Sequence, residues 1–281
     1  MRSCATSSSP EHTVMPNSMM DTWASGGETL GTWLSMASSH SAEIAGRAGF
    51  DYVCVDMQHG VADYQVAVEM MQAVEMGGGT PIVRVPWNEP GIIGRVLDAG
   101  ARGVVVPMVN SVAEAQAAVA ACKYPPLGAR SFGPVLVAAR AAAGENYFEV
   151  ANDTTACIPM IETRQAVEAL DDILAIEGVD AIYVGPADLS ISYGYGPGYT
   201  DDNADYKAAL EHIAERCAAH GVVAGIHSTA SLSADRRGKG YRMQTVAGDA
   251  MALGRGMARD LLTARESGVA EAATGADSKI Y

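Results

Sequence analysis

The stretch "DYVCVDMQHG" at residues 51–60 is an apolar run that ends abruptly on polar side chains. Residues 52–57 have the β-branched and aromatic composition of a buried strand. Asp56 lies near the end of this run, and Gln58 and His59 follow it directly. A buried strand ends on a carboxylate, an amide and an imidazole where those groups find polar partners, so we expect a polar site at this strand end.

Seven further β-branched runs alternate with alanine-rich stretches of helical period, several of which close on a glycine. The eight predicted strands span residues 30–36, 52–57, 81–85, 103–109, 156–162, 181–185, 222–227 and 243–249. This alternation predicts one α/β domain, a (β/α)₈ TIM barrel. A doubly wound open sheet is the alternative, but no strand is followed by the GxGxxG or GxxxxGK[ST] loop typical of that fold.

The composition excludes several classes of partner. The 281 residues carry a net charge of −14, whereas nucleic acids and anionic membranes attract clustered lysines and arginines. The five cysteines form no CxxC pair, which indicates reduced thiols and a cytoplasmic location. We expect no secretory signal and no membrane span, because no run approaches about 18 apolar residues. We also expect flexible tails over 1–28 and 266–281 around a barrel domain over 29–265.

The ends of barrel strands are where chemistry is expected, because the active sites of TIM barrels lie at the carboxyl ends of the strands. Trp33, in the first strand, is expected to pack there and to wall the pocket. The ionisable candidates at the other strand ends are Asp56, His59, Arg84, Glu162, Asp188 and His227.

Glu162 and Asp188 follow adjacent predicted strands, so their carboxylates are expected to converge. Two hard oxygen ligands suit Mg²⁺ or Mn²⁺, which retains waters and takes further ligands from a substrate. The alternative is a pair of carboxylates that form salt bridges with arginines.

Arg84 also has two interpretations. Its guanidinium suits bidentate binding of a substrate carboxylate, and the alternative is an ion pair with an aspartate at the same mouth. His59 is a candidate general base, or else a hydrogen-bonded histidine without chemistry. For His227 we favour a purely structural role.

The four lysines supply negative information. None of them closes an apolar strand, where a lysine that forms a Schiff base would be expected. If this barrel breaks carbon–carbon bonds, it is therefore expected to use a metal ion and an enolate.

Five ordered motifs together resemble the HpcH/HpaI aldolase family of metal-dependent class II pyruvate aldolases. The motifs are "FDYVCVDMQHG", "PIVRVPWNEPGIIGRVLDAGARGVVVPMVNS", "CKYPPLGARSFGP", "IPMIETRQAV" and "VDAIYVGPADLS". The resemblance spans roughly residues 29–262 and also implies the TIM barrel.

The resemblance implies a role for each matched residue. A divalent cation (Mg²⁺, Mn²⁺ or Co²⁺) would be held by Glu162 and Asp188. Arg84 would bind the 2-oxo acid and stabilise its enolate, and His59 would act as the base. Asp98 would raise the basicity of that histidine, and Asp56 is a second candidate to orient it. The loop of Gly185, Pro186 and Ala187 would cradle the carboxylate or oxo group of the substrate.

Two positions depart from the family pattern. Many members carry an acidic residue where this chain has Gln58. A substrate-binding glutamine of the family is replaced by Met160, which removes a hydrogen-bonding side chain from the pocket.

Members of the family commonly form hexamers, trimers of dimers that exchange a C-terminal helix, so a homo-oligomer is expected here.

The expected reaction is reversible aldol cleavage of a 4-hydroxy-2-oxo acid into pyruvate, or a related 2-oxo acid such as hydroxypyruvate, and an aldehyde. The first alternative is a lyase for a CoA thioester, as in the citrate-lyase-like branch, but that ligand needs a basic groove. The second is a barrel that binds a 2-oxo acid without catalysis.

Overall fold

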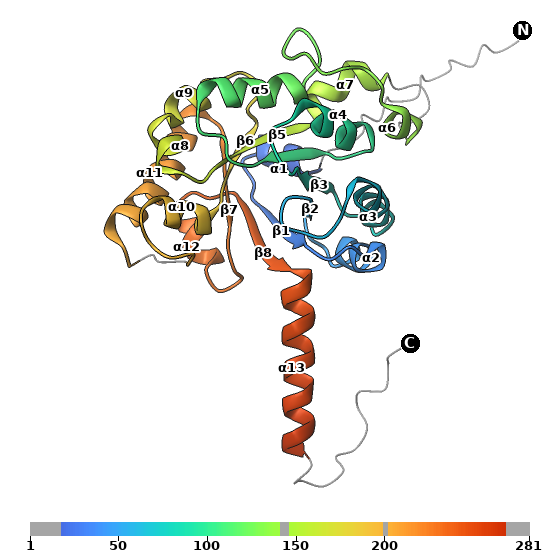
Figure 1. Ribbon diagram of the computed structural model, residues 1–281, viewed down its shortest axis with the longest axis vertical. Helices are drawn as coiled ribbons and strands as arrows, with labels where there is room; N and C mark the ends of the chain where they lie inside the picture. Colours follow the sequence, from blue (N-terminus) through green and yellow to red (C-terminus); the bar gives the residue numbers. More distant parts are fainter. Residues whose placement is uncertain (1–17, 141–145, 199–201, 268–281) are drawn as a thin grey trace, which may run out of the picture.

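The computed structural model describes residues 18–140, 146–198 and 202–267 and contains a closed barrel of eight parallel strands (Figure 1). Each strand pairs with its neighbours along the chain, and β1 closes the barrel against β8. The strands are β1 (Thr29–Leu34), β2 (Tyr52–Asp56), β3 (Pro81–Arg84), β4 (Gly103–Val106), β5 (Ala156–Ile161), β6 (Ala181–Val184), β7 (Val223–His227) and β8 (Met243–Gly248). The predicted TIM barrel and all eight predicted strands are confirmed, although most strands end one to three residues earlier than the apolar runs suggest.

The described part of the chain has thirteen helices, most of which surround the barrel on its outer side (Figure 1). They are α1 (Ser18–Ala24), α2 (Ser39–Arg47), α3 (Tyr64–Met76), α4 (Pro90–Asp98), α5 (Val112–Cys122), α6 (Val135–Arg140), α7 (Tyr147–Thr154), α8 (Arg164–Glu168), α9 (Leu170–Leu174), α10 (Pro186–Ser192), α11 (Ala204–His220), α12 (Ser233–Gly238) and α13 (Asp249–Ser267). Several begin at a capping side chain: Ser38, Asp63, Ser111 and Thr163 each accept a hydrogen bond from a backbone N–H in the first turn.

The strand pleat divides the core into two layers. Along β2, Val53 and Val55 pack outward against the helices, whereas Tyr52 and Cys54 point into the barrel. The other strands alternate in the same way, so the side chains that point inward near each carboxyl end meet at the mouth of the barrel. Gly31 belongs to this inner layer, and a Cβ at that position would collide with the ring of Tyr52.

Helix α1 corrects the prediction of an N-terminal tail over residues 1–28. Met19 and Trp23 are buried in the same cluster as the inward-pointing side chains of the barrel. The indole N–H of Trp23 donates to Thr29 Oγ1 at 3.0 Å. The local sequence is serine-rich and polar, but these two large side chains have apolar surface to cover, so the segment folds onto the barrel. Residues 1–17 of the predicted tail lie outside the described residues.

Helix α13 extends away from the barrel as a separate rod (Figure 1). Its apolar side chains Met251, Leu253, Met257, Leu261 and Leu262 are between 47% and 63% exposed. The helix continues to Ser267, into the predicted C-terminal tail, and 268–281 lie outside the described residues. No helix of the described part of the chain is long and apolar enough to cross a membrane.

Candidate active site

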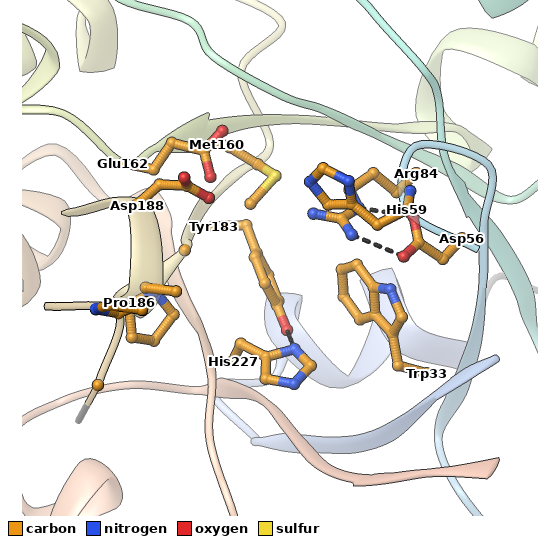
Figure 2. Close-up of a pocket in the computed structure, with 14 residues that line it drawn as sticks. Trp33, Asp56, His59, Arg84, Met160, Glu162, Tyr183, Pro186, Asp188 and His227 are labelled. Carbon is orange, nitrogen blue, oxygen red and sulfur yellow. Dashed lines mark hydrogen bonds and ion pairs between the residues drawn. The ribbon is translucent and has the colours of Figure 1, made fainter. Parts of the chain in front are cut away.

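A cavity of about 290 Å³ opens at the carboxyl ends of the strands (Figure 2). Its walls are formed by Trp33, Asp56, His59, Arg84, Met160, Glu162, Tyr183, Gly185, Pro186, Ala187, Asp188, Pro197, Gly198 and His227. Ten of the predicted site residues are therefore brought together, from strands that are far apart in the sequence. Strand periodicity explains this convergence, because Trp33, Asp56, Arg84 and Met160 occupy inward-pointing positions of four different strands.

The register between β2 and β3 pairs Asp56 directly with Arg84. Arg84 Nε donates to Asp56 Oδ1 at 2.8 Å, and Arg84 Nη2 donates to Oδ2 at 2.6 Å. Burial by itself would raise the pKa of Asp56, but the hydrogen bonds and charge of Arg84 lower it below its ordinary value. The guanidinium also lies 5.1 Å from the ring centre of Trp33. Arg84 is thus held as a fixed cation at the edge of the cavity.

Asp56 also shapes the turn that follows β2. Its Oδ1 accepts the backbone N–H groups of Gln58 at 3.0 Å and His59 at 3.3 Å. The exposed imidazole of His59 lies at the cavity wall, whereas Gln58 does not line the cavity. The sequence made Asp56 a candidate to orient His59, and in the structure its carboxylate contacts the backbone of the turn that carries His59.

Glu162 and Asp188 lie next to one another on the opposite side of the cavity (Figure 2). The Glu162 side chain is buried, and burial, together with the negative charge of Asp188, raises its pKa to about 7. Glu162 Oε1 accepts the backbone N–H of Met108 at 2.7 Å. Met108 has a φ of 54°, which is uncommon for a residue with a side chain and directs this N–H at the carboxylate.

The donor set of this pair fits a divalent cation. Two carboxylates share a partly buried site, and the neighbouring guanidinium of Arg84 is already paired with Asp56. Gly185, the residue before α10, keeps the site open, since a Cβ there would collide with Glu162 Oε2. Among the described residues, no cluster of three or more histidine, cysteine or acidic side chains forms a complete metal site. A cation would therefore take its remaining ligands from water or substrate.

Asp98 is the one predicted site residue that lies elsewhere. It ends α4, a helix that starts near the mouth and runs back toward the amino ends of the strands. Its Oδ1 accepts Arg130 Nη2 at 2.6 Å, in a separate cavity between α4 and α5. Asp98 and His59 of the same chain thus line different cavities, and the expected pairing does not form within this chain.

Four residues line the cavity that the sequence did not predict as site residues: Tyr183, Pro197, Gly198 and His227. Tyr183 occupies an inward-pointing position of β6, and the alternation of "AIYVG" would have identified it. His227 was expected to be structural only. Burial and the charge of Arg84 lower its pKa to about 4, so its imidazole is neutral near pH 7. Pro197 and Gly198 belong to a glycine- and tyrosine-rich segment after Asp188, which the sequence leaves open as a lid or a long loop and whose individual cavity residues it does not identify.

Comparison with known proteins places this geometry in a family. The family model described as HpcH/HpaI aldolase/citrate lyase matches residues 29–254. The 2-dehydro-3,6-dideoxy-6-sulfogluconate aldolase of Pseudomonas putida is 40% identical over 238 residues, which cover 84% of this chain and 91% of that protein. The hydroxypyruvate/pyruvate aldolase of Rhizorhabdus wittichii is 39% identical over 210 residues, which cover 75% and 83%.

A solved structure agrees with these sequence matches. A family protein from Burkholderia cenocepacia superposes with a TM-score of 0.83 and 31% identity, over 89% of this chain and all of that one. The matched region contains the whole barrel and every residue of the cavity. The chain therefore belongs to the HpcH/HpaI aldolase/citrate lyase family, as its five motifs predicted.

Proposed function

We propose that this protein is a class II aldolase that cleaves and forms 4-hydroxy-2-oxo acids. One fragment is pyruvate or a related 2-oxo acid such as hydroxypyruvate, and the other is an aldehyde. One observation carries the proposal: a single cavity holds three kinds of group together. These are a fixed guanidinium, an imidazole, and a pair of carboxylates that fits a divalent cation. The relatives named above are aldolases, which are carbon–carbon lyases.

Glu162 and Asp188 would hold the divalent cation, for which Mg²⁺, Mn²⁺ and Co²⁺ are the candidates. When bound, such a cation supplies a Lewis acid for the carboxylate and carbonyl oxygens of the 2-oxo acid. In the first turn of α10, the backbone N–H groups have no partner within the helix. Those of Ala187 and Asp188 are therefore suited to bind the substrate carboxylate.

Arg84 stabilises the negative charge that develops when the carbon–carbon bond breaks. Asp56 occupies Nε and one proton of Nη2, which leaves the other N–H groups of the fork for the substrate. Because the ion pair fixes the guanidinium before substrate arrives, little reorganisation is needed in the transition state.

His59 moves the proton. In the cleavage direction its imidazole accepts the proton of the 4-hydroxyl as the aldehyde forms, and in the synthetic direction it returns that proton. The Asp56 carboxylate fixes the backbone on which the imidazole is mounted. A CoA thioester is a poorer fit, because Arg84 is the only arginine or lysine among the described residues of the cavity wall.

The deciding experiment is deuterium exchange at the pyruvate methyl group, followed by NMR, with purified protein and Mg²⁺ or Mn²⁺. Exchange without any aldehyde shows enolisation, and excess EDTA should abolish it. Binding of pyruvate without exchange would favour a non-catalytic barrel, and full exchange in excess EDTA would exclude the class II mechanism.

We also propose a homo-oligomer in which α13 docks on a second copy of this chain. A largely apolar cavity of about 470 Å³ lies beside the base of α13, and its lining includes Leu34 of β1, Ile44 of α2 and Phe50, which lies between α2 and β2. The exposed apolar side chains farther along α13 match it in chemistry. An exchange of α13 between two copies would bury both surfaces, and the family resemblance favours a hexamer built from such dimers.

The oligomer is tested by light scattering after size exclusion. Met257→Glu should lower the molar mass by disrupting the docked face, whereas the exposed Arg255→Glu serves as the matched control. An unchanged mass for Met257→Glu would contradict the exchange.

We place the protein in the cytoplasm, because Cys54, Cys122, Cys157 and Cys217 are buried free thiols.

A further inference from the structure

A chain of hydrogen bonds runs behind one wall of the active-site cavity and ends at His227. The register between β7 and β8 pairs His227 with Thr245. Tyr183 Oη donates to Thr245 Oγ1 at 2.6 Å, and Tyr52 Oη lies 3.0 Å from the same oxygen. His227 Nδ1 lies 3.4 Å from Tyr183 Oη, as the dashed line in Figure 2 shows. Tyr52, Tyr183 and Thr245 are buried, so this series of hydrogen bonds is shielded from solvent.

The direction of these hydrogen bonds determines the tautomer of His227. A tyrosine hydroxyl has one proton, and Tyr183 donates it to Thr245. The oxygen of Tyr183 therefore accepts from Nδ1–H of His227, which places the lone pair of the neutral imidazole on Nε2. The imidazole is neutral near pH 7 because burial, with the charge of Arg84, lowers its pKa to about 4.

The second ring nitrogen remains available to a ligand. His227 is half-buried and lines the cavity, and its ring packs edge-on against Trp33 with 5.2 Å between ring centres. Within the described part of the chain, Nε2 has no hydrogen-bond partner, and it is not closed off from solvent. A neutral nitrogen with a free lone pair accepts a hydrogen bond, so it is suited to a hydroxyl group of a ligand and unsuited to a carboxylate.

The charges of the cavity also disfavour a second negatively charged group on the substrate. Arg84 is paired with Asp56, and Glu162 and Asp188 form the acidic side. The remaining described wall, which includes Trp33, Met160, Tyr183 and Pro197, carries no lysine or arginine. A second carboxylate or a sulfonate at the far end of a substrate would therefore lose its hydration without gaining a counter-charge.

We propose that His227 is a specificity-determining residue that accepts a hydrogen bond from a hydroxyl of the acceptor aldehyde, so that the enzyme selects uncharged hydroxyaldehydes. This inference rests on the proposed aldolase function and narrows it to a substrate class. Tyr183 acts as a positioning residue, because its oxygen fixes the tautomer and the orientation of the imidazole. Aldol addition to such an aldehyde yields a hydroxylated, sugar-acid-like 2-oxo acid.

The test compares two aldehydes that differ by one hydroxyl, glycolaldehyde and acetaldehyde, with pyruvate as the constant partner. The kcat/KM for each aldehyde is measured in wild-type protein with Mg²⁺, and the ratio of the two values is compared with the ratio in His227→Leu. Intrinsic differences in aldehyde reactivity cancel between wild type and variant. We expect the preference for glycolaldehyde to fall about tenfold in the variant, the effect of one neutral hydrogen bond.

Further variants separate hydrogen bonding from folding. His227→Asn, which retains an acceptor, should recover part of the preference, and Tyr183→Phe should lose part of it. His212→Leu, at an exposed position of α11, is the matched control and should leave the ratio unchanged. An unchanged ratio in His227→Leu would overturn the role of His227. In wild type, a higher kcat/KM for succinic semialdehyde than for glycolaldehyde would overturn the selection of uncharged aldehydes.

The outcome can be distinguished from failure of the proposed function itself. Wild-type protein that does not exchange the methyl protons of pyruvate lacks the aldolase activity altogether. Wild-type protein that exchanges these protons, but shows the same aldehyde ratio with and without His227, is an aldolase whose specificity has another source.

Discussion

Replacement of Glu162 by glutamine should stabilise the metal-free protein, and increasingly so as the pH rises. Glu162 is 2% exposed, and its pKa rises from an ordinary 4.5 to about 7. One pKa unit corresponds to about 1.36 kcal/mol, so ionisation of the buried carboxyl costs about 3 kcal/mol of folding free energy. The backbone N–H of Met108 can still donate to the amide oxygen of glutamine, which preserves the local hydrogen bond.

The sign follows from proton binding. Between pH 4.5 and about 7 the folded protein retains a proton that the unfolded chain has released, so wild-type stability from this group is present below pH 4.5 and is lost as the pH rises through about 7. About 2.5 kcal/mol of the loss falls between pH 5 and pH 8. Glu162→Gln carries no titrating group at this position and lacks this loss.

The assay is urea unfolding at pH 5, 6, 7 and 8 in EDTA, at one protein concentration. The difference in unfolding free energy between Glu162→Gln and wild type should grow by about 2.5 kcal/mol over this range. Glu69→Gln, at an exposed position of α3, is the control and should show no such trend. A difference that does not depend on pH, or one that shrinks toward pH 8, would refute the assignment of Glu162 as a carboxyl whose ionisation is opposed by burial and by the charge of Asp188.

Three further variants test the catalytic assignments. His59→Ala should lower kcat for retro-aldol cleavage by about 10²–10⁴-fold while Mn²⁺ binding, measured by electron paramagnetic resonance, persists; near-normal cleavage would remove the histidine from the mechanism. Arg84→Lys should lower kcat by about 10²–10³-fold although the charge remains, because an ammonium group lacks the planar fork of donors that bonds Asp56 and leaves further N–H groups for the substrate; retention of kcat would show that charge alone suffices. Gly185→Ala should weaken Mn²⁺ binding in the same assay, because the added Cβ collides with Glu162; unchanged affinity would show that the loop can move aside.

The sequence alone determined the barrel and most of its mouth. The two-residue period of strands and the glycines that close helices are local signals, so eight strands could be counted without knowledge of their partners. The same two-residue period identifies Asp56 and Arg84 as inward-pointing, and the family motifs added expected roles for Glu162, Asp188 and His59. These residues could be predicted because the place of each side chain depends only on the strand that it belongs to or follows.

Tertiary structure decided which side chains meet. The register between β2 and β3 turned two candidate residues into one Asp56–Arg84 ion pair. The direction of α4 carried Asp98 to Arg130 and away from His59. The register between β7 and β8 linked His227 to Thr245. These outcomes depend on how separate segments are aligned when the barrel closes, and no local pattern in the sequence records that alignment.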